Sequence, residues 1–153
     1  MSDRPLRILF LCTHNSARSI LAEGIATRLG AGQWIGYSAG STPSGRVNPF
    51  ALDVLRSMGC DTAGMHSKHW DTFTGAAAPV MDFVVTVCDN AAGETCPLWP
   101  GTPAQLHWGF ADPSTVGNDD AERRAAFAAT AELIGQRLQA FMREAGRPLA
   151  ANA

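Results

Sequence analysis

The sequence predicts an α/β fold, a single doubly wound domain whose four-stranded parallel sheet is flanked by helices. Apolar runs of strand length, such as ILFL at 8–11 and FVVTV at 83–87, alternate with segments whose apolar residues recur at helical spacing. These runs are continuous, as is typical of strands that a parallel sheet buries on both faces. With 153 residues, the chain has the size of one domain with one hydrophobic core.

The first part of the chain contains a strand, a helix and a second strand. The run LRILFLC at 6–12 predicts the first strand. The helix follows over 19–29, and we expect it to stop at Gly30, because glycine commonly ends a helix. The segment QWIGYSAG at 33–40 predicts the second strand, and a turn-rich segment comes after it.

A second helix is indicated by the residues at its two ends. Asn48 can cap it, Pro49 suits its first turn, and Gly59 comes just past its last residue. Three further elements complete the expected fold: strands at 82–88 and 104–110 and a long amphipathic helix over 119–146. We therefore expect one domain over 1–146 and a flexible tail over 147–153.

Composition excludes several classes of function. The formal net charge of -2 does not suit nucleic-acid binding, which calls for a basic surface. The longest apolar run near the N-terminus, ILFLC, is too short for a membrane span or a secretory signal, so we expect a cytoplasmic protein without membrane contact. In that compartment the four cysteines stay reduced, and loop cysteines are more often catalytic, redox-active or metal-binding.

Three segments with reactive side chains each follow a predicted strand. Cys12 ends the first of these strands, Cys88 ends the third, and GFADPS at 109–114 follows the fourth. The carboxyl ends of parallel strands meet at one edge of a sheet, where ligands bind. The three segments are therefore expected to converge on one site.

The loop CTHNSARS at 12–19 joins a strand to a helix. Such a loop exposes backbone N–H groups at the positive end of the helix dipole and binds tetrahedral oxyanions. The same donors should lower the pKa of Cys12 and make its thiolate a nucleophile. Arg18 can hold two oxygens of the anion and stabilise charge in the transition state. The expected oxyanion-binding residues are Thr13, His14, Asn15, Ser16, Ala17, Arg18 and Ser19.

Two residues of this loop have further expected roles. Asn15 tolerates the left-handed backbone and can fix the loop shape through its amide, and Ser19 can donate its hydroxyl to the thiolate. The alternative is a buried cysteine beside a surface arginine, a pair that chance often produces. The placement between strand and helix, at the binding edge of the sheet, favours the functional interpretation.

Several motifs resemble the low-molecular-weight protein tyrosine phosphatase family and, more closely, its arsenate reductase branch. They are CTHNSARS followed by AEG, then YSAGS, HSKHWD, VVTVCDNAAGETCP and HWGFADPS, which together span nearly the whole chain. The sequence departs from the family at His14, where a glycine is common. The resemblance implies the fold of that family and the reduction of arsenate to arsenite.

The implied mechanism uses three cysteines and one acid. Cys12 attacks arsenate while Asp112 protonates the departing oxygen, and Cys88 then attacks the Cys12 sulfur so that arsenite leaves. Cys96 passes the disulfide outward, where thioredoxin, or else glutaredoxin and glutathione, reduces it. The seven residues between Cys88 and Cys96 do not match the two to four of a zinc site, and neither a metal nor a bound cofactor is expected.

Two other functions remain open at this point. A low-molecular-weight protein tyrosine phosphatase needs only Cys12, and Cys88 could then be a core residue and Cys96 a stray thiol. Ser114 stands where such phosphatases usually place an aromatic residue to hold the phenyl ring, which favours the reductase. The chain could also be a non-enzymatic redox switch that reacts only once. We expect a monomer in each case.

Lys68 is the single lysine of the chain. Some thioredoxin-linked relatives bind potassium near the first loop, through residues that correspond to Asn15, Glu23 and Ser38, with an acidic residue near position 68. The hypothesis is that the Lys68 ammonium takes the place of the ion and pairs with Glu23. A solvated surface lysine is the alternative.

Overall fold

The computed structural model describes residues 4–75, 77–88, 99, 101 and 103–145. Its sheet contains four parallel strands in the order β2-β1-β3-β4. The strands are β1 (Leu6–Leu11), β2 (Trp34–Ala39), β3 (Phe83–Thr86) and β4 (Ala104–His107). The predicted fold class is thereby confirmed.

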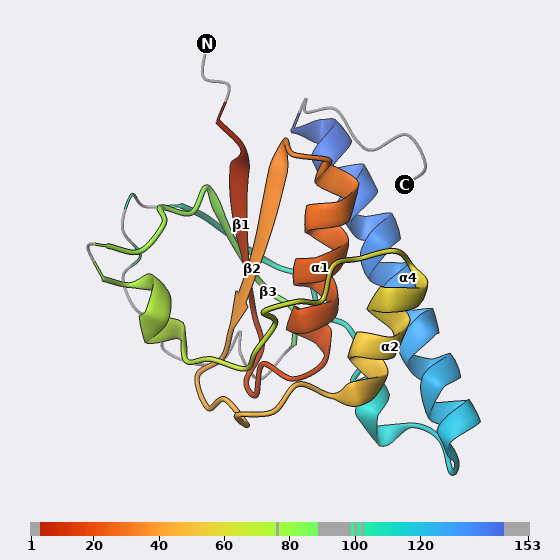
Figure 1. Ribbon diagram of the computed structural model, residues 1–153. Helices are drawn as coiled ribbons and strands as arrows, with labels where there is room; N and C mark the ends of the chain where they lie inside the picture. Colours follow the sequence, from red (N-terminus) through yellow and green to blue (C-terminus); the bar gives the residue numbers. More distant parts are fainter. Residues whose placement is uncertain (1–3, 76, 89–98, 100, 102, 146–153) are drawn as a thin grey trace.

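The helices cover the two faces of this sheet unequally. They are α1 (Arg18–Gly30), α2 (Pro49–Ser57), α4 (Asp120–Glu144) and the short 3-10 helices η1 (Trp70–Phe73) and η2 (Pro113–Thr115). Helices α1, α2 and α4 lie together on one side of the strands, and η1 lies on the other (Figure 1). None of the helices in the described ranges is long and apolar enough to cross a membrane.

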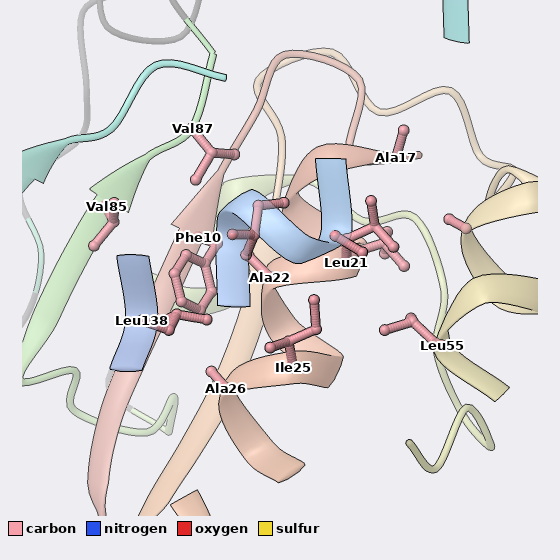
Figure 2. Close-up of a cluster of buried hydrophobic side chains, with 14 of the residues drawn as sticks. Phe10, Ala17, Leu21, Ala22, Ile25, Ala26, Leu55, Val85, Val87 and Leu138 are labelled. Atoms are coloured by element: carbon pink, nitrogen blue, oxygen red, sulfur yellow. The ribbon is translucent and has the colours of Figure 1, made fainter. Parts of the chain in front are cut away.

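The larger hydrophobic cluster fills the space between the sheet and the three long helices. Its members include Phe10 of β1, Ile25 of α1 and Leu138 of α4, each at most 2% exposed. Figure 2 shows these side chains converging from their three elements. A smaller cluster on the opposite face contains Phe73 of η1 and Trp99, packed against β1 and β3. Burial on both faces explains why β1 and β3 read as continuous apolar runs.

The helix ends mostly follow the predicted chemistry. The Asn48 side chain accepts a hydrogen bond from the backbone N–H of Phe50, as an N-cap does. Helix α1 ends at Gly30 as predicted, but Gly30 itself is helical and the left-handed residue that follows is Ala31. A Cβ at Gly30 would lie 2.4 Å from the Cβ of Trp34, so this glycine permits close packing of α1 on β2.

The strand ends converge as the sequence predicts. Cys12 directly follows β1 and Cys88 comes two residues after β3. The backbone N–H of Val87 donates to the Leu11 carbonyl (2.9 Å), and that of Phe110 donates to the Val87 carbonyl (3.1 Å). These two bonds tie the segments after β1, β3 and β4 together at one edge. Cys96 and the predicted tail at 147–153 lie outside the described residues.

Candidate active site

The loop after β1 takes its shape from one fully buried asparagine. Asn15 has a φ of 48°, the left-handed conformation predicted for it. Its Nδ2 donates to the Ser19 hydroxyl at 2.8 Å, and its Oδ1 accepts from the backbone N–H of Lys68 at 2.9 Å. The side chain therefore joins the loop, the first turn of α1 and a segment more than fifty residues away.

Neighbouring backbone holds the loop from outside. The carbonyls of Thr13, His14 and Ser16 accept hydrogen bonds of 2.9–3.0 Å from the N–H groups of Thr42, Ser44 and Asn48. The N–H of His14 is a hydrogen-bond donor to Cys12. Three carbonyls of the loop are therefore hydrogen-bonded to the segment at 42–48, and at least one backbone N–H is directed at the Cys12 sulfur. Backbone N–H groups directed at one point are what an anion-binding loop requires.

Arg18 begins α1 and retains unused donor capacity. Its Nη1 donates to the Phe110 carbonyl at 2.9 Å, and its Nη2 lies 3.6 Å from Oδ2 of Asp112. Its Nε is buried and has no hydrogen-bond partner among the described residues. An unpaired buried donor is unfavourable by roughly 1–3 kcal/mol, and an oxyanion beside the loop would remove that penalty.

Cys12 and Cys88 form a pair of free thiols. Their exposed fractions are 5% and 2%, and the two side chains are in hydrogen-bonding contact. The Thr13 hydroxyl lies 3.8 Å from the Cys88 sulfur. The sequence placed both cysteines at one edge, and the structure brings their sulfur atoms together.

The pKa of Cys12 moves in the opposite direction from the one predicted. The neighbouring Cys88 thiol and burial raise this pKa, while Arg18 and the His14 N–H act to lower it. The prediction of a lowered pKa is wrong for this arrangement, because it considered the loop donors without a second thiol. Two adjacent sulfurs resist a second negative charge, so the pair retains a proton.

Asp112 lies beside Arg18, near the edge of the sheet where the strand ends converge. Its Oδ1 accepts from both the N–H (2.9 Å) and the hydroxyl (2.7 Å) of Ser114, so Asp112 is the N-cap of the short helix η2. Its Oδ2 faces Arg18. One carboxylate oxygen is therefore fixed by the turn, and the other is directed at the residue that would hold the anion.

Lys68 supports the loop through its contacts with Asn15, Ser38 and Glu23. Its ammonium donates to the carbonyls of Ser38 (2.9 Å) and His66 (2.8 Å) and lies 3.9 Å from a carboxylate oxygen of Glu23. That same oxygen accepts a short bond from the Ser38 hydroxyl. With side-chain exposures of 13% for Lys68 and 19% for Glu23, this is a mostly buried pair rather than a surface lysine.

Burial acts on both members of this pair. It lowers the pKa of Lys68, opposed by Glu23, and it raises the pKa of Glu23, opposed by the Ser38 hydroxyl, Lys68 and His66. The ammonium already lies among the oxygens of Ser38 and Glu23. These residues consequently do not fit an additional potassium ion, and within the described ranges no group of three or more metal-ligating side chains occurs.

Sequence reasoning missed two contacts that shape the site. The Phe110 carbonyl fixes Arg18, and the Lys68 backbone N–H fixes Asn15. Backbone groups carry no residue-type signal, so no motif could have indicated either contact. Cys60 is buried and belongs to the larger hydrophobic cluster.

Comparison with known proteins gives consistent results. A model of the family described as low molecular weight phosphotyrosine protein phosphatase matches residues 7–151. An arsenate reductase of Halalkalibacterium halodurans is 38% identical over 134 residues, which cover 88% of this chain and 93% of that protein. A solved structure described as an arsenate reductase in the oxidized state has a TM-score of 0.70 and 26% identity, covering 90% of this chain and 97% of the other.

A longer protein shares the fold. The structure of a thioredoxin-dependent arsenate reductase of Corynebacterium glutamicum has a TM-score of 0.66 at 22% identity. The match covers 94% of this chain but 63% of that one.

Proposed function

The chain belongs to the low molecular weight phosphotyrosine protein phosphatase family, and we propose that within this family it reduces arsenate to arsenite. The observation that carries this proposal is the contact between two free thiols, Cys12 and Cys88, at an anion-binding loop. Phosphate-ester hydrolysis needs one thiol, whereas arsenate reduction needs two electrons, which two thiols supply by forming a disulfide. The arsenate reductase named above, at 38% identity, supports the same function.

The first step forms a bond between sulfur and arsenic. The loop N–H groups and Arg18 hold the arsenate oxygens, and the buried Nε of Arg18 thereby gains a partner. The Cys12 thiolate attacks arsenic, and one oxygen leaves as water after Asp112 protonates it. Arsenic remains As(V) in this adduct.

The second step transfers the electrons. Cys88 attacks the Cys12 sulfur, the pair of electrons of the sulfur–arsenic bond goes to arsenic, and the Cys88 proton goes to an oxygen of the departing arsenite. Arsenite, As(III), leaves, and a disulfide joins Cys12 to Cys88. The contact already present between these two sulfurs supports this step, because a disulfide requires their Cα atoms to lie within about 7 Å.

The third step regenerates Cys12. Cys96 attacks Cys88, frees the Cys12 thiolate and leaves a Cys88–Cys96 disulfide, which the two thiols of thioredoxin reduce. Glutaredoxin with glutathione is the alternative donor. The role of Cys96 rests on the sequence resemblance. We also propose a cytoplasmic, monomeric enzyme whose catalytic domain spans 1–146.

Lys68 completes the proposal as a positioning residue. Its ammonium neutralises Glu23, and its backbone N–H fixes Asn15, so it holds the loop in the shape that binds the anion. In this role it takes the place of the potassium ion that the resemblance implies for some relatives.

The decisive assay measures arsenite formation with thioredoxin, thioredoxin reductase and NADPH. We expect many turnovers by the wild type, none by Cys12→Ser or Cys88→Ser, and normal turnover by the matched control Cys60→Ser. Hydrolysis of p-nitrophenyl phosphate should be weak and should require Cys12 but not Cys88. If Cys88→Ser reduced arsenate at the rate of the wild type, the proposal would be contradicted. If the wild type reduced arsenate only once per molecule, the result would support the redox switch instead. If it reduced no arsenate but hydrolysed p-nitrophenyl phosphate rapidly, the result would support the phosphatase.

A further inference from the structure

A groove lies between the segment that follows β4 and the outer face of α4. Its volume is about 600 Å³, and its walls include Trp108 and Phe110 on one side and Leu133 and Arg137 on the other. Leu133 is 57% exposed, the largest exposure among the large apolar side chains described. Leu133 therefore adds exposed apolar surface to the groove.

The groove is connected to the redox-active edge by backbone hydrogen bonds. The N–H of Phe110 donates to the carbonyl of Val87, the residue before Cys88, at 3.1 Å. The carbonyl of the same Phe110 accepts from Arg18 at 2.9 Å. Phe110 therefore links the groove to the strand end that carries Cys88 and to the arginine of the anion site.

The groove also carries a positive charge that the described residues leave unpaired. The Arg137 guanidinium lies 5.2 Å from the centroid of the Trp108 ring, in a cation–π contact, and forms no ion pair within the described ranges. Arginine is among the residue types that most often dominate the energy of protein–protein interfaces. An acidic side chain set in an apolar surface would match this groove in charge and polarity.

We propose that this groove is the docking surface for the dithiol protein that reduces the enzyme, a thioredoxin-type partner with an acidic side chain that pairs with Arg137. The proposal rests on the proposed function, since only a relay that ends in a disulfide needs such a partner. A protein reductant must bring its attacking sulfur to the edge of the sheet at Cys88. The segment after β4 is hydrogen-bonded to that strand end, so a partner seated in the groove is held beside its target.

The test separates docking from arsenate chemistry. The protein is oxidised with diamide in the absence of arsenate, and the rate of its reduction by a bacterial thioredoxin is measured under second-order conditions. The variants are Arg137→Glu and Leu133→Ser. The matched control is Arg123→Glu, the same charge change on the same helix about 21 Å away along its axis. Reduction by dithiothreitol, which needs no docking, is measured in parallel.

We expect the second-order rate constant with thioredoxin to fall at least fivefold in Arg137→Glu and Leu133→Ser and to stay within twofold in Arg123→Glu. Reduction by dithiothreitol should be unchanged in all three. Equal rates with thioredoxin for the wild type and Arg137→Glu would overturn the docking role of the groove but not the proposed function. If thioredoxin reduced the wild type no faster than dithiothreitol does, both the groove and thioredoxin as the proposed donor would be overturned.

Discussion

The two sides of the loop at 12–19 differ in how completely their polar groups are paired. On one side, both the Nδ2 and the Oδ1 of Asn15 form hydrogen bonds, and Lys68 and Glu23 form a mostly buried ion pair. On the other side, the Nε of Arg18 has no partner among the described residues, and Cys12 contacts a second thiol. We refer to these as the support side (Asn15, Ser19, Glu23, Ser38, Lys68) and the reaction side (Cys12, Arg18, Cys88, Asp112).

This difference shows how the loop can be rigid and reactive at once. Groups that are fully paired fix the backbone, and the unpaired groups opposite are left to bind an anion and to exchange protons and electrons. Changes on the reaction side should therefore reduce activity with little effect on stability. Changes on the support side should reduce both.

Apart from the loss of a catalytic thiol, the largest effect is expected for Arg18→Lys. A lysine supplies one point charge in place of a planar fork, so it cannot hold two oxygens of the anion in the transition state. We expect kcat/KM for arsenate to fall by roughly 10²–10³, with a nearly unchanged unfolding midpoint. Arg46→Lys, at an exposed position on the neighbouring segment, is the control. A loss of less than fivefold in kcat/KM for Arg18→Lys would contradict the claim that Arg18 holds two oxygens of the anion in the transition state.

Asn15→Ala should weaken the support side most. It removes two buried hydrogen bonds and places an alanine in the left-handed conformation, with an expected loss of roughly 3–5 kcal/mol in the free energy of unfolding. Asn15→Gly loses the same bonds without the backbone strain and should be about 1 kcal/mol more stable than the alanine variant. Urea denaturation measures both. Equal stability of the two variants would show that the left-handed conformation carries no cost.

Lys68→Met tests the buried pair. It leaves Glu23 buried without its cation, and we expect a loss of roughly 1–3 kcal/mol and a several-fold loss of activity. Because burial raises the pKa of Glu23, the carboxyl can take up a proton as the pH falls, so the stability deficit should shrink toward acid pH. Arg46→Met is the exposed control.

The same residue makes a second measurement informative. Wild-type activity should be equal in potassium and in sodium, since the Lys68 ammonium lies among the oxygens that an ion would need. A several-fold increase in wild-type activity with potassium over sodium would contradict the role assigned to Lys68.

The smallest change is expected in the titration of Cys12. Because the Cys88 thiol is the main cause of its raised pKa, Cys88→Ala should lower that pKa. The rate of Cys12 alkylation by iodoacetamide, followed against pH, should then rise at lower pH than in the wild type. Cys60→Ala should leave the profile in place. A profile that moved to higher pH in Cys88→Ala would mean that Cys88 stabilises the thiolate of Cys12 rather than its thiol.

Much of this arrangement could be predicted from the sequence because it depends on local patterns. The continuous apolar runs of β1 and β3 gave a parallel sheet, and parallel strands necessarily bring Cys12 and Cys88 to one edge. The left-handed Asn15 follows from the conformational tolerance of asparagine. Each inference needs only neighbouring residues and the geometry of one element.

The remainder depends on contacts between distant segments. The segment at 60–69 has no helical or strand periodicity, yet its backbone fixes Asn15, and an isolated bridge pairs Gly40 with His69. The direction of the Cys12 pKa likewise follows from how close Cys88 comes, which spacing along the chain does not determine. Gly30 ends α1 as predicted, but it permits close packing against Trp34, and the left-handed conformation belongs to Ala31.

The central claim is that Cys12, Cys88 and Cys96 pass a disulfide outward after reducing arsenate. Its most direct test is a thiol count on the fully reduced protein, treated with excess arsenate without any external reductant and then digested under non-reducing conditions. We predict the loss of two thiols and recovery of a peptide bridged from Cys88 to Cys96, with Cys12 free. No arsenate-dependent loss of thiols, in a protein whose cysteines were all reduced at the start, would contradict the relay.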